Sequence, residues 1–69
     1  MIMHKDVESS AIHSASYDTS NGTLTIEFNR GGKYEYPNVP QEHYQGLVDA
    51  PSVGKYFHEN IKQYSVKKV

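Results

Sequence analysis

An asparagine–glycine turn that follows one strand-like run and precedes another is the feature that most restricts how this chain can fold. After Asn21-Gly22, residues 23–28 (Thr-Leu-Thr-Ile-Glu-Phe) alternate between polar and apolar side chains, which is the period of a half-buried β-strand. Asn-Gly favours a tight hairpin because both residues tolerate positive φ. Residues 11–17 precede the turn and are predicted to form the partner strand. The predicted core face of the second strand consists of Leu24, Ile26 and Phe28.

The length of the hairpin loop sets which residues of the two strands are paired. A two-residue loop at Asn21-Gly22 pairs Tyr17 with Ile26, and a four-residue loop from Thr19 to Gly22 pairs Tyr17 with Leu24. These registers differ by two residues, so the same side chains face the core in both. We therefore expect His13, Ala15 and Tyr17 to share the apolar face of the second strand.

A third strand is predicted over residues 33–36 (Lys-Tyr-Glu-Tyr), after the loop Asn29-Arg30-Gly31-Gly32. A three-residue loop pairs Tyr34 with Phe28 and Tyr36 with Ile26, and it places both rings in the core. A two- or four-residue loop places them on the outer face of the sheet. The inner position would fill a core that has few other large residues. The outer position would make a platform on which unpaired bases could stack.

Helical spacing replaces the alternation after Pro37. Tyr44, Leu47 and Val48 form one apolar stripe, and Pro51 ends that helix. Ser52 is a natural N-cap for a second helix, in which an apolar residue recurs every four positions at Val53, Phe57 and Ile61. Three antiparallel strands followed by two short helices packed on one face predict a two-layer α+β fold. No repeat or linker is visible, so residues 1–69 are expected to form a single domain.

The size and composition of the chain restrict its function. A chain of 69 residues supports one small core and leaves little material for a catalytic cleft. It has no cysteine, and no apolar run approaches the roughly 20 residues of a membrane span. The first residues lack the apolar core of a signal peptide. The expectation is a cytoplasmic protein without a membrane segment.

Motifs for catalysis or metal binding are weak. The histidines at 4, 13, 43 and 58 lack the spacing of metal ligands. Ser52 and Lys55 form a Ser-x-x-Lys pattern, but the capping role accounts for Ser52, and the rest of such an active site is missing. We expect no catalytic residue, no metal site and no cofactor.

Many short motifs, in order, resemble the KTSC domain, from about Val7 to Val69. They include Ser9-Ser10-Ala11-Ile12, Leu24-Thr25-Ile26-Glu27-Phe28, Gly32-Lys33-Tyr34-Glu35-Tyr36 and Ala50-Pro51-Ser52-Val53-Gly54-Lys55-Tyr56-Phe57. That family is named after the C-terminus of some lysyl-tRNA synthetases, and it also occurs alone in bacterial and phage proteins. The resemblance implies a binding module with RNA or tRNA as a possible ligand. Pro51 and Gly46 depart from the family's usual pattern.

Positive charge is concentrated near the C-terminus. Up to residue 50 three cations accompany seven acids, whereas afterwards four lysines (Lys55, Lys62, Lys67 and Lys68) accompany Glu59 alone. A solvated helix face with a basic tail explains this pattern, and so would contacts with phosphates. The start of the second helix offers free amides, a glycine for close approach (Gly54) and a cation (Lys55), but capping and packing explain it as well.

Three kinds of function fit these features. The first is a nucleic-acid accessory module, the second is a binder of a nucleotide or other small phosphorylated ligand, and the third is a protein-interaction domain that uses a sheet edge or a tyrosine-rich patch. The residues predicted to contact nucleic acid or an anion are Arg30, Lys33, Ser52, Gly54, Lys55, Lys62, Lys67 and Lys68. The predicted aromatic contacts are Tyr34 and Tyr36.

Overall fold

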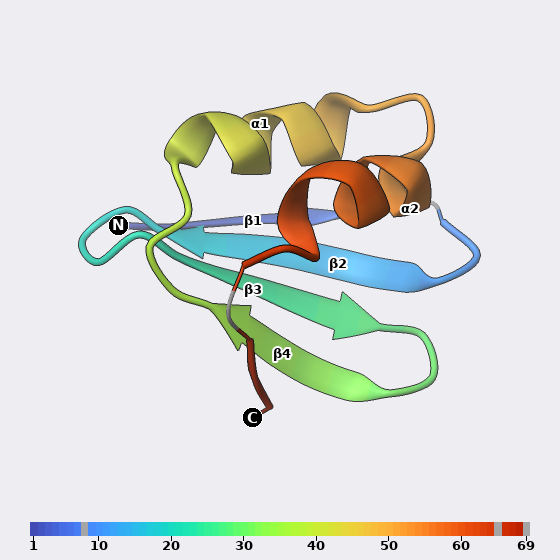
Figure 1. Ribbon diagram of the computed structural model, residues 1–69, viewed down its shortest axis with the longest axis horizontal. Coiled ribbons are helices and arrows are strands. Elements are labelled where there is room, and N and C mark those ends of the chain that lie inside the picture. The colour runs from blue at the N-terminus through green and yellow to red at the C-terminus, as the bar shows by residue number, and fades with distance from the viewer. Residues whose placement is uncertain (8, 65, 69) are drawn as a thin grey trace.

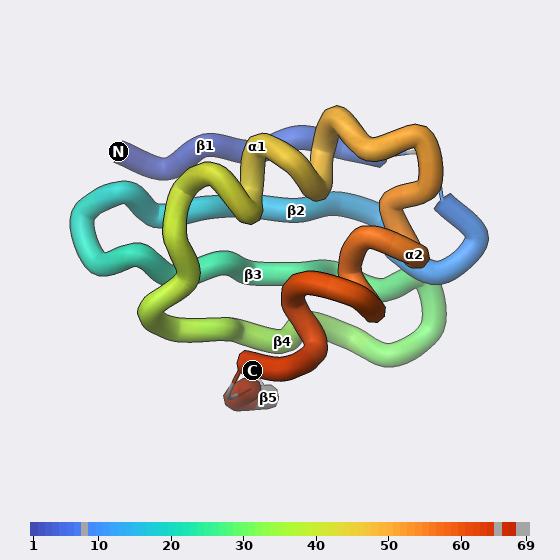
Figure 2. Tube along the Cα trace, turned by 45° about the horizontal axis from the view of Figure 1, so that its top comes forward, coloured from blue at the N-terminus to red at the C-terminus, as the bar shows by residue number. Residues whose placement is uncertain are grey.

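The structure is a computed structural model that describes residues 1–7, 9–64 and 66–68. Its elements are β1 (Ile2–Asp6), β2 (Ile12–Asp18), β3 (Thr23–Phe28), β4 (Gly32–Tyr36), α1 (Gln41–Asp49), α2 (Val53–Tyr56), η1 (Phe57–Ile61) and β5 (Lys67–Lys68). The strands form one antiparallel sheet in the order β1-β2-β3-β4-β5, and both helices cover the same face of it (Figures 1 and 2). The predicted α+β fold, with an antiparallel sheet and two short helices, is confirmed.

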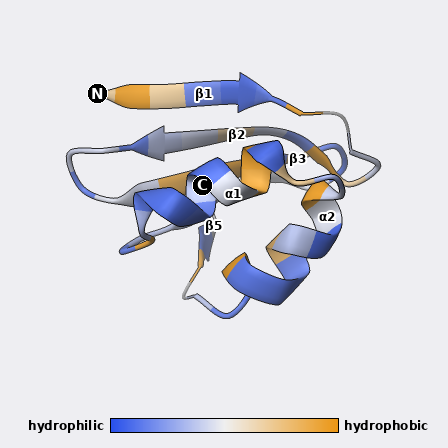
Figure 3. Cartoon of the chain, turned by 90° about the horizontal axis from the view of Figure 1, so that it is seen from above, coloured by the Kyte–Doolittle hydropathy of each residue, from blue (hydrophilic) through white to orange (hydrophobic). Residues whose placement is uncertain are grey.

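The prediction of three strands was wrong, because the sheet has four strands of five to seven residues and a two-residue fifth strand. The missed strand β1 is apolar at its start and hydrophilic at its end, so it has no alternating pattern (Figure 3). Within β1 only Met3 is partly buried. Hydrogen bonds of the main chain to β2 define this strand, and they leave no signature in the order of side chains.

The hairpin of β2 and β3 has the longer of the two predicted loops. Tyr17 lies opposite Leu24 and Asp18 opposite Thr23, which leaves residues 19–22 as the loop. Gly22 has a φ of 70°, and its amide donates to the Asp18 carbonyl at 2.8 Å. The glycine of the turn is thus needed for its left-handed backbone.

The prediction that His13 faces the core was wrong. Ile12 pairs with Phe28 and Ser14 pairs with Glu27, so residues 13 and 14 lie opposite a single residue of β3, which is a β-bulge. The bulge turns Ile12 inward, where its side chain is fully buried, and leaves His13 exposed. Burying isoleucine in place of an imidazole removes more apolar surface from water, which favours the irregular register.

Both tyrosines of β4 face the helices. Residues 29–31 form a three-residue loop, and Gly32, with a φ of 82°, lies opposite Phe28. Tyr34 is therefore opposite Ile26 and Tyr36 opposite Leu24. The expected partners were wrong by two residues, because pairing Tyr34 with Phe28 requires a five-residue loop (residues 29–33), whereas the three-residue loop pairs Gly32 with Phe28. A shift of two preserves the face. The inner placement is the correct one.

The helices bury the apolar stripes that their spacing predicted. Tyr44 and Leu47 of α1 are buried, as are Val53, Phe57 and Ile61. The Ser52 hydroxyl accepts the Lys55 amide at 3.4 Å, so Ser52 caps α2 as predicted. After α2 the helix widens into a π-helical turn, η1, in which the Lys62 amide donates to the Phe57 carbonyl five residues earlier at 3.0 Å.

Candidate functional site

A groove lies on the helix side of the sheet, between η1 and the end of the β3–β4 hairpin. Its volume is about 760 Å³. It exists because α1 packs over β2, and the second helix is too short to cover the hairpin end. The residues that line the groove are Ser10, Ala11, Phe28, Asn29, Arg30, Gly31, Tyr34, Tyr36, Phe57, Lys62 and Val66.

Four aromatic rings form the apolar part of the groove. Phe28 is in edge-to-face contact with Tyr34, with centroids 5.5 Å apart and planes at 81°, and with Phe57, at 5.5 Å and 79°. Tyr36 meets Phe57 in the same way at 5.8 Å. Tyr36 and Phe57 are buried, whereas Phe28 and Tyr34 are only half-buried. The last two rings therefore present free surface at nearly a right angle to one another.

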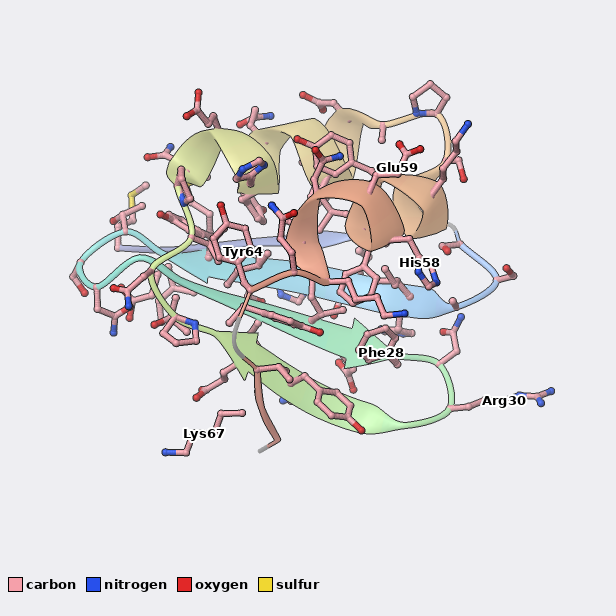
Figure 4. All side chains as sticks on the ribbon, in the orientation of Figure 1. Phe28, Arg30, His58, Glu59, Tyr64 and Lys67 are labelled. Carbon is pink, nitrogen blue, oxygen red and sulfur yellow. The ribbon has the colours of Figure 1, made fainter. Side chains whose placement is uncertain are left out.

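Two cations come from opposite walls of the groove. Arg30 lies at the tip of the hairpin and extends away from the body of the protein (Figure 4). Lys62 follows η1 on the other wall. The π-helical turn adds a residue to the helical turn, and this brings Lys62 to the wall that Phe57 also lines. None of the described lining residues is acidic, and Glu59 of η1 points away from the sheet (Figure 4).

The wall formed by residues 9–11 is fixed to the hairpin by hydrogen bonds. The Asn29 amide donates to the Ala11 carbonyl at 2.9 Å, and the Asn29 side chain donates to the Ser9 carbonyl at 2.9 Å. The Ser9 hydroxyl in turn accepts the amides of Ala11 and Ile12 at 3.2 and 3.4 Å. This side of the groove is therefore preformed.

The groove also affects the ionisation of a tyrosine. Burial, and secondarily the neighbouring Tyr34, raises the pKa of the Tyr36 hydroxyl. A tyrosine with an ordinary pKa of about 10 is already neutral at physiological pH, and the raised pKa extends the neutral range of Tyr36 to higher pH. An anionic group can approach Arg30 and Lys62 without meeting a phenolate.

Residues 8–64 match the sequence profile of the KTSC domain. The chain belongs to the KTSC domain family. A KTSC domain protein from Yersinia pestis has the same fold, with a TM-score of 0.94 and 34% identity over 100% of this chain and 99% of the other. Both β1 and β5 lie outside the matched segment.

Relatives place the KTSC domain in two settings. A lysine–tRNA ligase of Trichormus variabilis is 46% identical over 55 residues, which are 80% of this chain and 10% of the ligase. A protein of Stutzerimonas stutzeri is 38% identical over 56 residues, which are 81% of this chain and 79% of that protein. The chain thus spans only about a tenth of the ligases that it resembles.

The structure brings four of the predicted contact residues of this KTSC domain together and separates the others. Arg30, Lys62, Tyr34 and Tyr36 all line the groove. Lys33 lies opposite Glu27, and Lys67 opposite Glu35, so both belong to the face of the sheet that the helices do not cover. Figure 4 shows Lys67 pointing away from the helices.

The start of α2 is not part of the groove. Ser52 acts as the helix cap, Lys55 is exposed, and Gly54 packs toward Ser9, where an added Cβ would lie 3.8 Å from the Ser9 hydroxyl. These observations fit the packing interpretation of the Ser52–Lys55 segment. The backbone of Lys68 pairs with Tyr34, and its side chain lies outside the part of the chain that is described.

Sequence reasoning assigned Phe28 and Phe57 to the core and missed their place in the groove. One signal was available for Phe28: it is the last core-facing residue of its strand and precedes a loop with two glycines. A large ring at the end of a strand has less cover than one in the middle. For Phe57 the regular spacing of four gave no sign of the π-helical turn.

A Ser–His–Asp chain on the outer face was also missed. The His4 ring lies 2.7 Å from the Ser16 hydroxyl through Nδ1 and 3.0 Å from an Asp6 carboxylate oxygen through Nε2. The side chains of His4 and Asp6 are 55% and 76% exposed, so water competes for both contacts. Ser16 lies within β2, which pairs with strands on both sides, so its surroundings supply no free backbone amides for an oxyanion. The contacts fit a polar cross-strand cluster.

Two further findings concern the described residues 1–7, 9–64 and 66–68. No group of three or more histidine and acidic side chains there could hold a metal ion. No helix in this part of the chain is long and apolar enough to cross a membrane.

Proposed function

We propose that this KTSC domain is a non-catalytic RNA-binding module and that the groove is its contact surface. The observation that carries the proposal is the groove itself, in which aromatic surface lies between Arg30 and Lys62 with no acid among the described lining residues. Aromatic rings stack on bases of any sequence, and cations contact the phosphates on either side.

The expected interaction energies suit a domain that binds RNA weakly. Base–aromatic stacking contributes about 1–3 kcal/mol per base, and each phosphate contact adds a salt-dependent part. The overall charge of −1 gives no general attraction to nucleic acid, so binding has to come from local contacts. The resemblance to a segment of lysine–tRNA ligases supports RNA as the ligand class, since those enzymes are named for a tRNA substrate.

The same groove suits a second candidate, a nucleotide or another small phosphorylated ligand. The observation in its favour is the preformed wall at residues 9–11, because a fixed concave site lowers the ordering cost for a small molecule. A nucleotide would use the same rings and one of the two cations. The two candidates therefore differ in how affinity changes with the length of the ligand.

Titration of a fluorescein-labelled single-stranded RNA at low salt, followed by fluorescence anisotropy, tests the proposal. We expect saturable binding that weakens as salt is raised, and weaker binding by the double variant Arg30→Gln/Lys62→Gln. A thermal-stability screen with mononucleotides tests the second candidate, because a ligand that binds the folded state raises the melting temperature. A flat RNA titration with a clear nucleotide shift would replace the first proposal with the second.

A further inference from the structure

We infer that the groove takes one unpaired base and that the RNA strand crosses it, with a phosphate at Arg30 and another at Lys62. This inference rests on the proposed RNA binding and specifies which RNA is bound. It predicts preference for single strands, loops and bulges over continuous duplex. It also predicts that a nucleotide within a strand binds better than a free one.

The arrangement of the rings favours a single inserted base. Phe28 and Tyr34 stand at 81° to each other, and both retain exposed surface. A flat ring can stack on one of them while its edge contacts the other, which is the geometry that aromatic rings already adopt in this cluster. Both faces of a base inside a duplex are covered by its neighbours, so only an unpaired base can enter.

The floor of the groove limits how deep the base can go. Phe57 and Tyr36 are 8% and 5% exposed, and their edge-to-face contact closes the space beneath the other two rings. Hydrogen bonds from Asn29 to residues 9 and 11 hold the neighbouring wall in place. The site is therefore formed before the ligand arrives, which reduces the entropy lost on binding.

The two cations favour a strand over a free nucleotide. Arg30 belongs to the hairpin, and Lys62 is brought to the opposite wall by the π-helical turn. A mononucleotide has one phosphate group and can meet only one wall at a time. A strand whose base enters the groove has a phosphate on each side of that nucleotide, so both walls can be used.

Four ligands distinguish these possibilities: a single-stranded RNA heptamer, a blunt duplex, the same duplex with one bulged nucleotide, and a nucleoside monophosphate. We expect the heptamer and the bulged duplex to bind at least tenfold more tightly than the blunt duplex and the monophosphate. Equal binding of blunt and bulged duplex would overturn the inference while the proposed RNA binding stands. Binding of the monophosphate as tightly as the heptamer would overturn the strand crossing. If no RNA binds, both proposals fail.

Variants locate the base and the phosphates. Tyr34→Leu keeps an apolar side chain without the ring, and it should weaken heptamer binding by about 5- to 150-fold with little effect on the blunt duplex. Tyr34→Phe keeps the ring and should retain the affinity. If Tyr34→Leu fails to fold, amide chemical shifts of the unaltered protein decide instead, because changes confined to residues outside the groove would overturn the inference.

Salt dependence counts the phosphate contacts. For single strands each contact contributes about 0.7 to the slope of log affinity against log salt. Arg30→Gln and Lys62→Gln should each reduce the magnitude of that slope by about this amount, and together by about 1.4. Lys5→Gln, an exposed lysine on the edge strand β1, is the matched control and should leave the slope unchanged when it is measured at 0.15 M salt and above, where charges outside the groove are screened. An unchanged slope in the double variant would overturn the placement of the strand.

Discussion

Because the Tyr36 hydroxyl is buried beneath the groove, the stability of the domain depends on the protonation state of this hydroxyl. Burial first, and the nearby Tyr34 second, raise its pKa, so the folded state favours the neutral phenol. Such a group contributes stability that is fully present below the pKa of the unfolded state, about 10, and is lost as the pH rises through the higher pKa of the folded state. Burial also raises the pKa of Tyr44.

We therefore predict that the free energy of unfolding falls less steeply in Tyr36→Phe than in the unaltered protein between pH 8 and pH 11. Adding Tyr44→Phe should flatten the profile further. Urea unfolding followed by circular dichroism at both pH values gives the comparison, with each variant referred to its own stability at pH 8. Parallel profiles for all three proteins would show that these hydroxyls do not control the alkaline loss.

His13 and Ile12 show why single residues were only partly predictable. The alternation of side chains predicted that His13 faces the core. A shift of the strand register by two residues would not change that prediction, because it keeps every side chain on the same face. A β-bulge is a shift of one, and it occurs because Ile12 gains more from burial than His13 loses from exposure. The alternation of side chains does not mark where the extra residue of a bulge falls, so pattern alone does not reveal it.

The contact between α1 and α2 depends on one glycine. A Cβ added to Gly46 would overlap the Tyr56 hydroxyl and lie 2.7 Å from its Cζ atom. That hydroxyl also lies 3.5 Å from Nδ1 of His43. Gly46 therefore allows the Tyr56 ring to lie across α1, although glycine inside a helix is unfavourable by about 1 kcal/mol relative to alanine.

We predict that the effect of Gly46→Ala on the free energy of unfolding has opposite signs in the unaltered protein and in a Tyr56→Ala background. In the unaltered protein it should destabilise the fold by about 1–3 kcal/mol because Tyr56 is displaced. In a Tyr56→Ala background the overlap is gone, and the same substitution should stabilise the fold by up to about 1 kcal/mol through helix propensity. Denaturant unfolding of the four proteins forms a double-mutant cycle. The same effect in both backgrounds would contradict the role of Tyr56.

The elements that sequence patterns revealed are those with a buried apolar stripe. Alternation predicted β2, β3 and β4. Helical spacing predicted both helices, with apolar residues at i, i+3 and i+4 in the first and at every fourth position in the second, since these patterns reflect which side chains are removed from water. Strand β1 buries little more than part of Met3 and is held by main-chain hydrogen bonds to β2, so its sequence shows no pattern of buried side chains. The π-helical turn also has no signature in the sequence, because Phe57 and Ile61 are buried in it at the spacing of an ordinary helix.

The candidate site exists because the two layers of the domain differ in extent. The sheet is longer than the helices that cover it, so the hairpin end keeps its aromatic residues partly exposed between the two walls. The choice of Tyr34, Tyr36, Arg30 and Lys62 could be made from residue type alone. Residue type alone could not show that these four residues lie apart from Lys33, Lys55 and Lys67. That separation depends on the face of the sheet that each strand residue occupies and on where α2 begins.

The protein extends over 29 × 23 × 21 Å. Changing the salt concentration can therefore distinguish charges that contact RNA in the groove from charges elsewhere on the protein that act on the RNA only at a distance. The Debye length is about 8 Å at 0.15 M salt and about 30 Å at 0.01 M, so distant charges act on the RNA only at low salt. We predict that Lys62→Gln weakens binding of single-stranded RNA at both concentrations. Lys5→Gln on β1 should weaken it, and Glu42→Gln on α1 should strengthen it, only at 0.01 M. Anisotropy titrations of the three variants decide the point, since equal losses from Lys5→Gln and Lys62→Gln at 0.15 M would place the RNA outside the groove.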